Sequence, residues 1–104
     1  MAFEIEERTK KKLEAICRKY AVKHIKVFGS AARDDFNFST SDMDLLVEFN
    51  DPPSGMRSSK QFFGLQEELQ ELFGRRIDLL EESAIENARL KQNALADAVI
   101  LYAA

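Results

Sequence analysis

GSAARDDFNFSTSDMDLLVEF, the stretch from Gly29 to Phe49, joins a Gly-Ser turn to two aspartates at the start of an apolar strand. Side chains alternate along a strand, so Asp42 and Asp44 are expected to share one face. Two like charges at close range need solvent, a basic partner or a cation. Mg²⁺ takes hard oxygen ligands and completes its shell with water and substrate phosphate, so the pair predicts a magnesium site.

The Gly29-Ser30 turn lies between a predicted strand at residues 24–28 and a predicted short helix, and eleven residues separate it from the aspartates. Backbone N–H groups and the helix dipole at such a turn favour an anion. Taken alone, the dipeptide is better explained by an ordinary turn with an N-cap serine, and the aspartate pair by a solvated strand end. Together the two signals favour a nucleotide-phosphate site.

Hydrophobic periodicity predicts the elements around this stretch. Apolar residues at helical spacing predict one amphipathic helix from about residue 5 to residue 20 and a second that ends at Gly74. Runs of β-branched, aromatic and other apolar residues predict three strands, at residues 24–28, 43–49 and 76–80. A last helix is expected from Ile85 onward, because one stripe holds Leu90, Ala94, Leu95, Ala98, Val99 and Tyr102.

Length and composition predict a single domain over residues 1–104. A chain of this size with 45% hydrophobic residues can close one core, and it shows no repeat or linker. We therefore expect an α/β (α+β) domain with a small mixed sheet of three to four strands and helices packed on it. The absence of a signal sequence or a long apolar run, with a single cysteine, predicts a cytoplasmic protein without membrane contact.

The charge distribution does not predict direct binding to nucleic acid. The net charge is −3, although residues 1–28 hold eight Lys or Arg against four acids. These basic residues fit the solvated face of the first helix, because a dedicated nucleic-acid binder is usually basic overall.

The motif residues resemble the minimal nucleotidyltransferase (MNT) domain of the DNA polymerase β-like superfamily. Its signature is Gly-Ser, a spacer of about this length, and Asp-x-Asp leading into an apolar strand. Asp78 in RRIDLLEE matches the third acid of the family on a neighbouring strand, and the ending NARLKQNALADAVILY resembles the closing helix of minimal members. The resemblance implies a polymerase β palm-like fold in which Asp42 and Asp44 bridge two Mg²⁺ ions. It also implies that Asp78 joins the ion that activates the attacking hydroxyl.

Three other residues keep two interpretations each. Asp78 follows Arg75-Arg76, so a surface ion pair is its alternative to metal binding. Arg33 is a candidate contact for the triphosphate or an exposed helix arginine, and Asp34-Asp35 follow it where family members often have glycine. The only histidine, His24, is interpreted as a strand residue rather than a catalytic base.

The resemblance implies transfer of a nucleoside monophosphate, AMP from ATP or the equivalent from another NTP, with release of pyrophosphate. No substrate-binding domain is expected, so the predicted acceptor is a hydroxyl of another protein. Minimal members are typically antitoxins that adenylylate HEPN toxins on tyrosine, and a HEPN-type partner is the leading hypothesis. The alternatives are a non-catalytic antitoxin that acts by binding alone and a nucleic-acid-binding regulator; a homo-oligomer is compatible with each.

Overall fold

The described part of the chain forms a four-stranded sheet with two α-helices packed on it. The structure is a computed structural model that describes residues 6–28, 43–85, 89, 92 and 98–104. Within these residues the elements are α1 (Glu7–Lys19), β1 (Val22–Phe28), β2 (Met43–Phe49), α2 (Ser58–Phe73), β3 (Ile77–Glu81), the 3₁₀ turn η2 (Glu82–Ala84) and β4 (Val99–Ala103).

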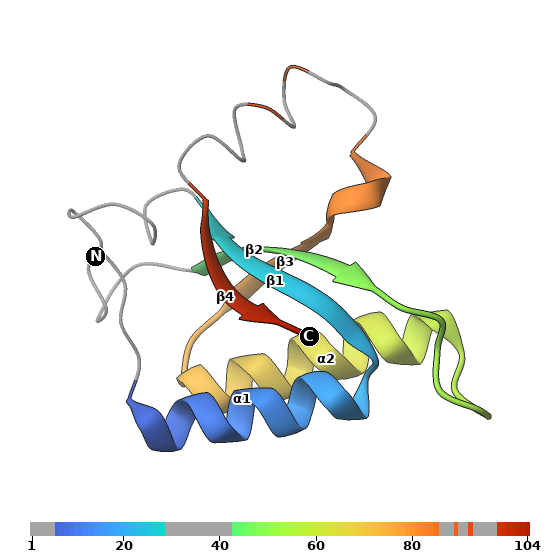
Figure 1. The fold of residues 1–104 in the computed structure, drawn as a ribbon, viewed down its shortest axis with the longest axis horizontal. Coiled ribbons are helices and arrows are strands. Elements are labelled where there is room, and N and C mark those ends of the chain that lie inside the picture. The colour runs from blue at the N-terminus through green and yellow to red at the C-terminus, as the bar shows by residue number, and fades with distance from the viewer. Residues whose placement is uncertain (1–5, 29–42, 86–88, 90–91, 93–97) are drawn as a thin grey trace.

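The four strands form one mixed sheet in the order β3-β2-β1-β4. β1 is antiparallel to both of its neighbours, whereas β2 and β3 are parallel. A parallel pair needs a crossover connection, and α2 supplies it. Figure 1 shows α1 and α2 side by side on one face of the sheet. We call the opposite face the distal face. The architecture confirms the predicted α+β class and the predicted small mixed sheet.

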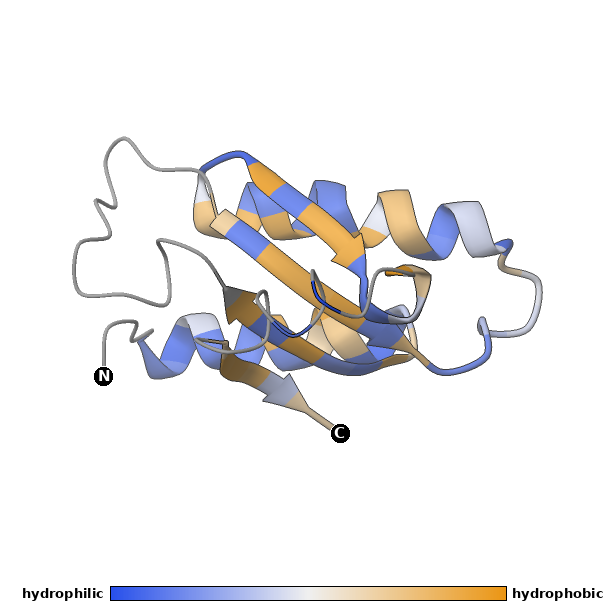
Figure 2. Cartoon of the chain, turned by 90° about the horizontal axis from the view of Figure 1, so that it is seen from above, coloured by the Kyte–Doolittle hydropathy of each residue, from blue (hydrophilic) through white to orange (hydrophobic). Residues whose placement is uncertain are grey.

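The core lies between the sheet and the two helices. Strand residues alternate between this core and the distal face; in β3, Ile77 and Leu79 are buried while Asp78 and Leu80 are exposed. Figure 2 shows the resulting bands of apolar and polar residues along the strands. Cys17 is fully buried on the inner face of α1.

α1 and α2 are held together where α1 ends. The ring of Tyr20 lies against Gly64 of α2, where a Cβ atom would come within 2.8 Å of the ring. The buried side chain of Gln61 donates hydrogen bonds to the carbonyls of Tyr20, at 2.8 Å, and Asn50, at 3.1 Å. α2 ends at the predicted Gly74, which has the left-handed conformation (φ 64°) that glycine adopts without strain.

The prediction of a helix reaching Tyr102 is wrong. Residues 99–103 form strand β4, which pairs with β1 in an antiparallel ladder. The stripe that includes Val99 and Tyr102 has helical spacing, but β-branched residues also fit a strand, and the open side of β1 provides the hydrogen-bonding partner. Leu90, Ala94 and Leu95 of the stripe lie outside the described residues, as does the short helix predicted after Ser30.

None of the helices within the described ranges is long and apolar enough to cross a membrane.

Candidate active site

Asp44 and Asp78 occupy facing positions on neighbouring parallel strands. Their Cα atoms are register partners in the β2–β3 ladder, and neighbouring strands lie roughly 4.8 Å apart. Ile77 and Leu79, on either side of Asp78, enter the core, so Asp78 projects from the distal face. Asp44 shares that face because paired positions point the same way. Each aspartate is the second residue of its strand, so both stand at one end of this parallel pair. Asp78 is exposed and Asp44 is half-buried.

The two described residues that flank the segment 29–42 both lie beside Asp44. Phe28, the last residue of β1, is the register partner of Asp44, and Met43 opens β2. The amide of Met43 also donates a hydrogen bond of 3.2 Å to the carbonyl of Arg76, which ties the start of β2 to the approach of β3. The sequence attaches Gly29 directly to Phe28 and Asp42 directly to Met43.

Four of the predicted site residues belong to that segment and lie outside the described residues: Gly29, Ser30, Arg33 and Asp42. Of the predicted set, the structure therefore describes Asp44 and Asp78, and it brings these two together. The neighbouring-strand position predicted for Asp78 is the one it occupies.

The chemistry of this donor set fits a hard divalent cation. Carboxylate oxygens are the ligands that Mg²⁺ prefers, and a cation would offset the repulsion between two carboxylates on one face. No group of three His, Cys, Asp or Glu side chains suited to a metal occurs among the residues that the structure describes. Asp44 and Asp78 are two carboxylates of this kind, and the predicted third is Asp42.

The sequence matches a family model described as a nucleotidyltransferase domain over residues 9–101. The chain belongs to the nucleotidyltransferase domain family. The match includes β1, β2 and β3 and therefore the strands that carry Asp44 and Asp78. Members of this family typically use a divalent metal, in agreement with the donor set.

This nucleotidyltransferase is similar in sequence to other proteins and in fold to solved structures, of which two each are described. A Methanocaldococcus jannaschii protein named "Putative protein adenylyltransferase MJ0128" is 35% identical over 96 residues, which is 92% of this chain and 93% of that protein. The protein adenylyltransferase MntA of Thermococcus cleftensis is 36% identical over 73 residues, 70% of this chain and 69% of MntA.

Among solved structures, one described as a "putative minimal nucleotidyltransferase" superposes with a TM-score of 0.70 at 29% identity and covers 88% of each chain. A Shewanella oneidensis complex of a tri-AMPylated HEPN toxin with its MNT antitoxin matches with a TM-score of 0.61 at 16% identity, over 96% of this chain and 74% of the other. The second likeness concerns the fold alone. The resemblance to minimal nucleotidyltransferases expected from the motif is thus confirmed.

A second charged cluster lies on the distal face of the nucleotidyltransferase. Glu82 of η2 is only 7% exposed; its Oε2 atom lies 2.7 Å from His24 Nε2, and its Oε1 atom accepts a hydrogen bond of 3.2 Å from Lys26 Nζ. Burial acts to raise the pKa of Glu82, but the hydrogen bonds and charges of His24 and Lys26 outweigh it and hold the pKa below its usual value.

This cluster ties the end of β3 to β1. Lys26 faces Leu46 in the ladder, two residues along β2 from Asp44, so the cluster begins roughly 7 Å from the aspartates along the strand. His24 is a strand residue, as predicted, but its partner is 58 positions away in the sequence and no local pattern links the two.

The only cysteine of the nucleotidyltransferase is not a candidate nucleophile. Burial, with a smaller contribution from Glu14, raises the pKa of the Cys17 thiol to about 12. The thiolate is the reactive form of cysteine, and it is scarce near neutral pH at such a pKa.

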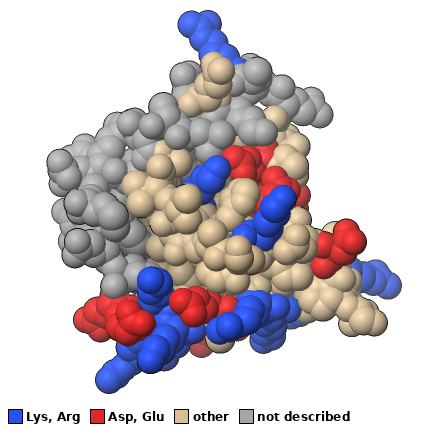
Figure 3. Space-filling view, in the orientation of Figure 1, with Lys and Arg blue, Asp and Glu red and all other residues tan. Residues whose placement is uncertain are grey.

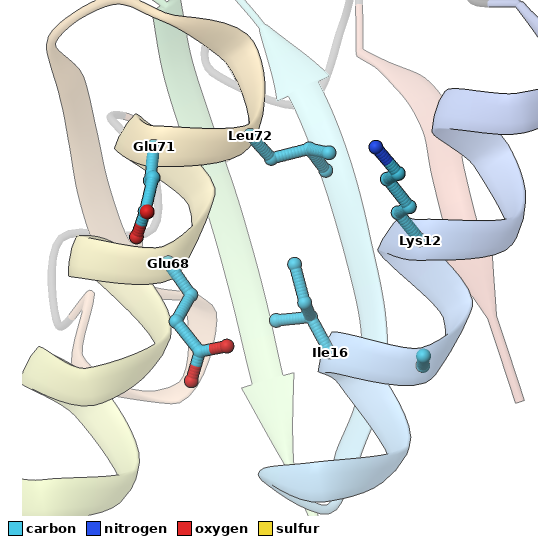
Figure 4. A pocket seen from close by; sticks show the side chains of 6 residues that line it. Lys12, Ile16, Glu68, Glu71 and Leu72 are labelled. Carbon is cyan, nitrogen blue, oxygen red and sulfur yellow. The ribbon is translucent and has the colours of Figure 1, made fainter.

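A groove between α1 and α2 is separate from the aspartates, because the helices cover the other face of the sheet. It has a volume of about 470 Å³ and is lined by Lys12, Ala15, Ile16, Glu68, Glu71 and Leu72. Figure 4 shows the apolar side chains of Ile16 and Leu72 directed into the space between the helices. Neither Asp44 nor Asp78, the two predicted site residues that the structure describes, lines this groove.

Proposed function

We propose that this nucleotidyltransferase transfers AMP from ATP to a hydroxyl of a partner protein, with a HEPN toxin as the leading partner. The observation that carries the proposal is the register of Asp44 opposite Asp78, at the point where both ends of the segment 29–42 meet the sheet. This register puts two of the three predicted acidic ligands side by side, and the sequence attaches the third, Asp42, to the start of the same strand.

Each site residue has a definite task in the proposal. Asp42 and Asp44 would hold two Mg²⁺ ions together, and Asp78 would hold the one nearer the acceptor. When bound, the ions lower the pKa of the attacking hydroxyl and neutralise charge on the phosphates. Gly29 allows the backbone to approach the phosphates, and Ser30 donates its hydroxyl to a phosphate oxygen.

Arg33 supplies a positive charge for the triphosphate. In the transfer, the acceptor oxygen forms a bond to the α-phosphorus. The bond from that phosphorus to the bridging oxygen of the β-phosphate breaks, pyrophosphate leaves with the electron pair, and the acceptor loses its proton.

The position of Asp78 supports a protein as the acceptor. β3 is an edge of the four-stranded sheet, and Asp78 is exposed on it. A large partner can therefore bring a side-chain hydroxyl to this edge. Both relatives named above are protein adenylyltransferases by name, which favours ATP as donor and protein as acceptor. The HEPN toxin and MNT antitoxin complex of S. oneidensis suggests the kind of partner.

The test incubates the chain with Mg²⁺, ATP labelled on the α-phosphate and the protein encoded beside it. We expect label on the partner, and none when the label is on the γ-phosphate. Asp44→Asn should reduce transfer by about 100-fold or more, because it removes a charged ligand from the reacting site.

Glu48→Gln is the matched control, since Glu48 lies on the same strand and is also half-buried. It should retain transfer within about two-fold. If no nucleotide transfers label while the two proteins still form a tight complex, the chain neutralises its partner by binding alone. Equal loss in both variants would show that the effect does not depend on the position of Asp44.

A further inference from the structure

β4 forms the edge of the sheet opposite to β3. Its residues 99–103, VILYA, contain neither a charge nor a proline. Edge strands expose unpaired backbone N–H and C=O groups, and proteins commonly protect them with charged residues or prolines. In the described ranges, β4 pairs with β1 and with no other strand. This edge therefore retains the features that allow another strand to pair with it.

A groove runs between this edge and α1. Its volume is about 540 Å³, and its lining consists of Lys10, Leu13, Glu14 and Arg18 from α1 with residues 100–103 of β4. Ile100 is 64% exposed, so a large apolar side chain beside the groove is open to contact with a ligand. Figure 1 shows β4 at the front of the sheet with α1 below it. The groove thus offers backbone hydrogen bonding, apolar surface and charge together.

The charge beside the groove is mainly positive. α1 lines the groove with two basic side chains, Lys10 and Arg18, and one acid, Glu14. Of the other basic residues of α1, Lys12 lines the groove to α2 and Lys19 forms an ion pair with Glu68. Figure 3 shows Lys and Arg gathered, with acidic residues among them, along the lower edge of the molecule over α1. Glu14 compensates part of this charge through an ion pair of 4.0 Å with Arg18. An anionic ligand is therefore favoured along this side.

We propose that the groove between α1 and β4 binds an extended acidic segment of a partner protein, which adds to β4 as a further strand. This inference does not depend on the proposed transfer reaction. The amide of Ala104 donates to the carbonyl of Lys23 at 3.0 Å, so the preceding amide, that of Ala103, points away from β1. A backbone carbonyl of the added strand accepts from it. Alternate acidic side chains of the segment face Lys10 and Arg18, and the others cover Ile100.

Two other occupants fit these features less well. Symmetric pairing of two β4 strands in a dimer would bring two α1 helices together across the two-fold axis, and both present Lys10 and Arg18 to that side. A nucleic acid would gain little from the apolar strand and would meet Glu14 in the groove. The acidic extended peptide uses all three features.

The test measures binding of a fluorescent eight-residue peptide of alternating Val and Glu to the full chain, by fluorescence anisotropy and by amide chemical shifts. We expect binding that weakens with salt and shifts centred on residues 99–104. Lys10→Glu should weaken binding about ten-fold, as should Ala103→Pro, which removes the outward amide. Lys12→Glu is the matched control, because Lys12 is on the same helix but lines the other groove. It should bind as the wild type does.

Several results would overturn the inference. These are equal affinity for a Val and Lys peptide, equal weakening by Lys12→Glu and Lys10→Glu, or amide shifts away from β4. Protection of the β4 amides that rises with the concentration of the chain alone would identify a second copy as the occupant. Tighter binding of an oligonucleotide than of the acidic peptide would identify nucleic acid.

Discussion

The ring of Tyr20 lies so close to Gly64 that a methyl group on that glycine would stand 2.8 Å from Cε1 and 2.9 Å from the hydroxyl oxygen of the tyrosine. The contact joins the end of α1 to the middle of α2. Glycine in a helix interior is otherwise unfavourable by about 1 kcal/mol relative to alanine, so its presence here is explained by the close approach of the ring.

Gly64→Ala is therefore expected to destabilise the chain. Overpacking costs about 1–3 kcal/mol and outweighs the gain in helix propensity. The measurement is urea unfolding of the single variants and of the double variant with Tyr20→Ala. In the Tyr20→Ala background the same change should instead stabilise by up to about 1 kcal/mol. Destabilisation in both backgrounds would show that the ring is not the cause.

Gln61→Met should lower the free energy of unfolding by about 1–3 kcal/mol. The amide of Gln61 is buried and donates to two backbone carbonyls, at Tyr20 and Asn50, which lose their partner in the variant. Lys60→Met, at the exposed neighbouring position, should change the stability by less than about 0.5 kcal/mol. Equal effects of the two substitutions would contradict the role given to the amide.

Glu82→Gln should remove a part of the stability that depends on pH. The pKa of Glu82 is lowered in the folded chain, because hydrogen bonds from His24 and Lys26 outweigh its burial. Its contribution is thus fully present above the unfolded pKa, about 4.3, and is lost as the pH falls through the folded value. Near neutral pH, the free energy of unfolding of the wild type should be about 2 kcal/mol higher than that of the variant.

Unfolding in urea at several pH values checks this expectation. The difference between the two proteins should shrink as the pH falls below about 4.3. Glu68, whose pKa is also lowered, by hydrogen bonds from Tyr20 and Lys19, is present in both proteins and cancels in the comparison. A difference that stays constant with pH would mean that Glu82 acts through packing rather than charge.

Mg²⁺ should raise the melting temperature of the wild type, and a chelator should reverse the rise. A ligand that binds only the folded chain stabilises it by mass action. Differential scanning calorimetry of the double variant Asp44→Asn and Asp78→Asn should show a smaller rise, since these side chains are the proposed ligands. Glu48→Gln is the control, and Mg²⁺ should raise its melting temperature as much as that of the wild type. An undiminished effect of Mg²⁺ in the double variant would place the ion elsewhere.

Cys17 should resist thiol reagents in the folded chain. Its burial and its pKa of about 12 leave little accessible thiolate near neutral pH. A colorimetric disulfide reagent should report the thiol at full rate only in concentrated guanidinium chloride. Rapid reaction without denaturant would show that α1 separates readily from the sheet.

The parts of the fold that follow from local periodicity were predictable. α1, α2 and the strands that contain His24, Leu45 and Leu79 are specified by apolar residues at spacings set by the helix and the strand. β4 was not predictable in this way, because its apolar residues also fit a helical stripe and its strand conformation depends on the ladder with β1.

The candidate site was likewise predictable only where it depends on local sequence. A shared face for Asp42 and Asp44 is predicted from strand alternation and stays a prediction, because Asp42 lies outside the described residues. Asp44 opposite Asp78 depends on a sheet register that no local pattern specifies. Asp42, Gly29, Ser30 and Arg33 remain predictions. The pairing of Glu82 with His24 escaped sequence reasoning because 58 positions separate two ordinary polar residues, and only the tertiary fold joins them.

The sheet order has a consequence for local opening of the fold. The strands that frame Asp44 and Asp78 are β1, β2 and β3, and in the part of the chain that the structure describes β4 pairs with β1 alone. β4 can therefore separate from the sheet while the ladders from β1 to β2 and from β2 to β3 stay paired. Opening at this edge leaves Asp44 opposite Asp78, so β4 completes the sheet rather than the framework of the site.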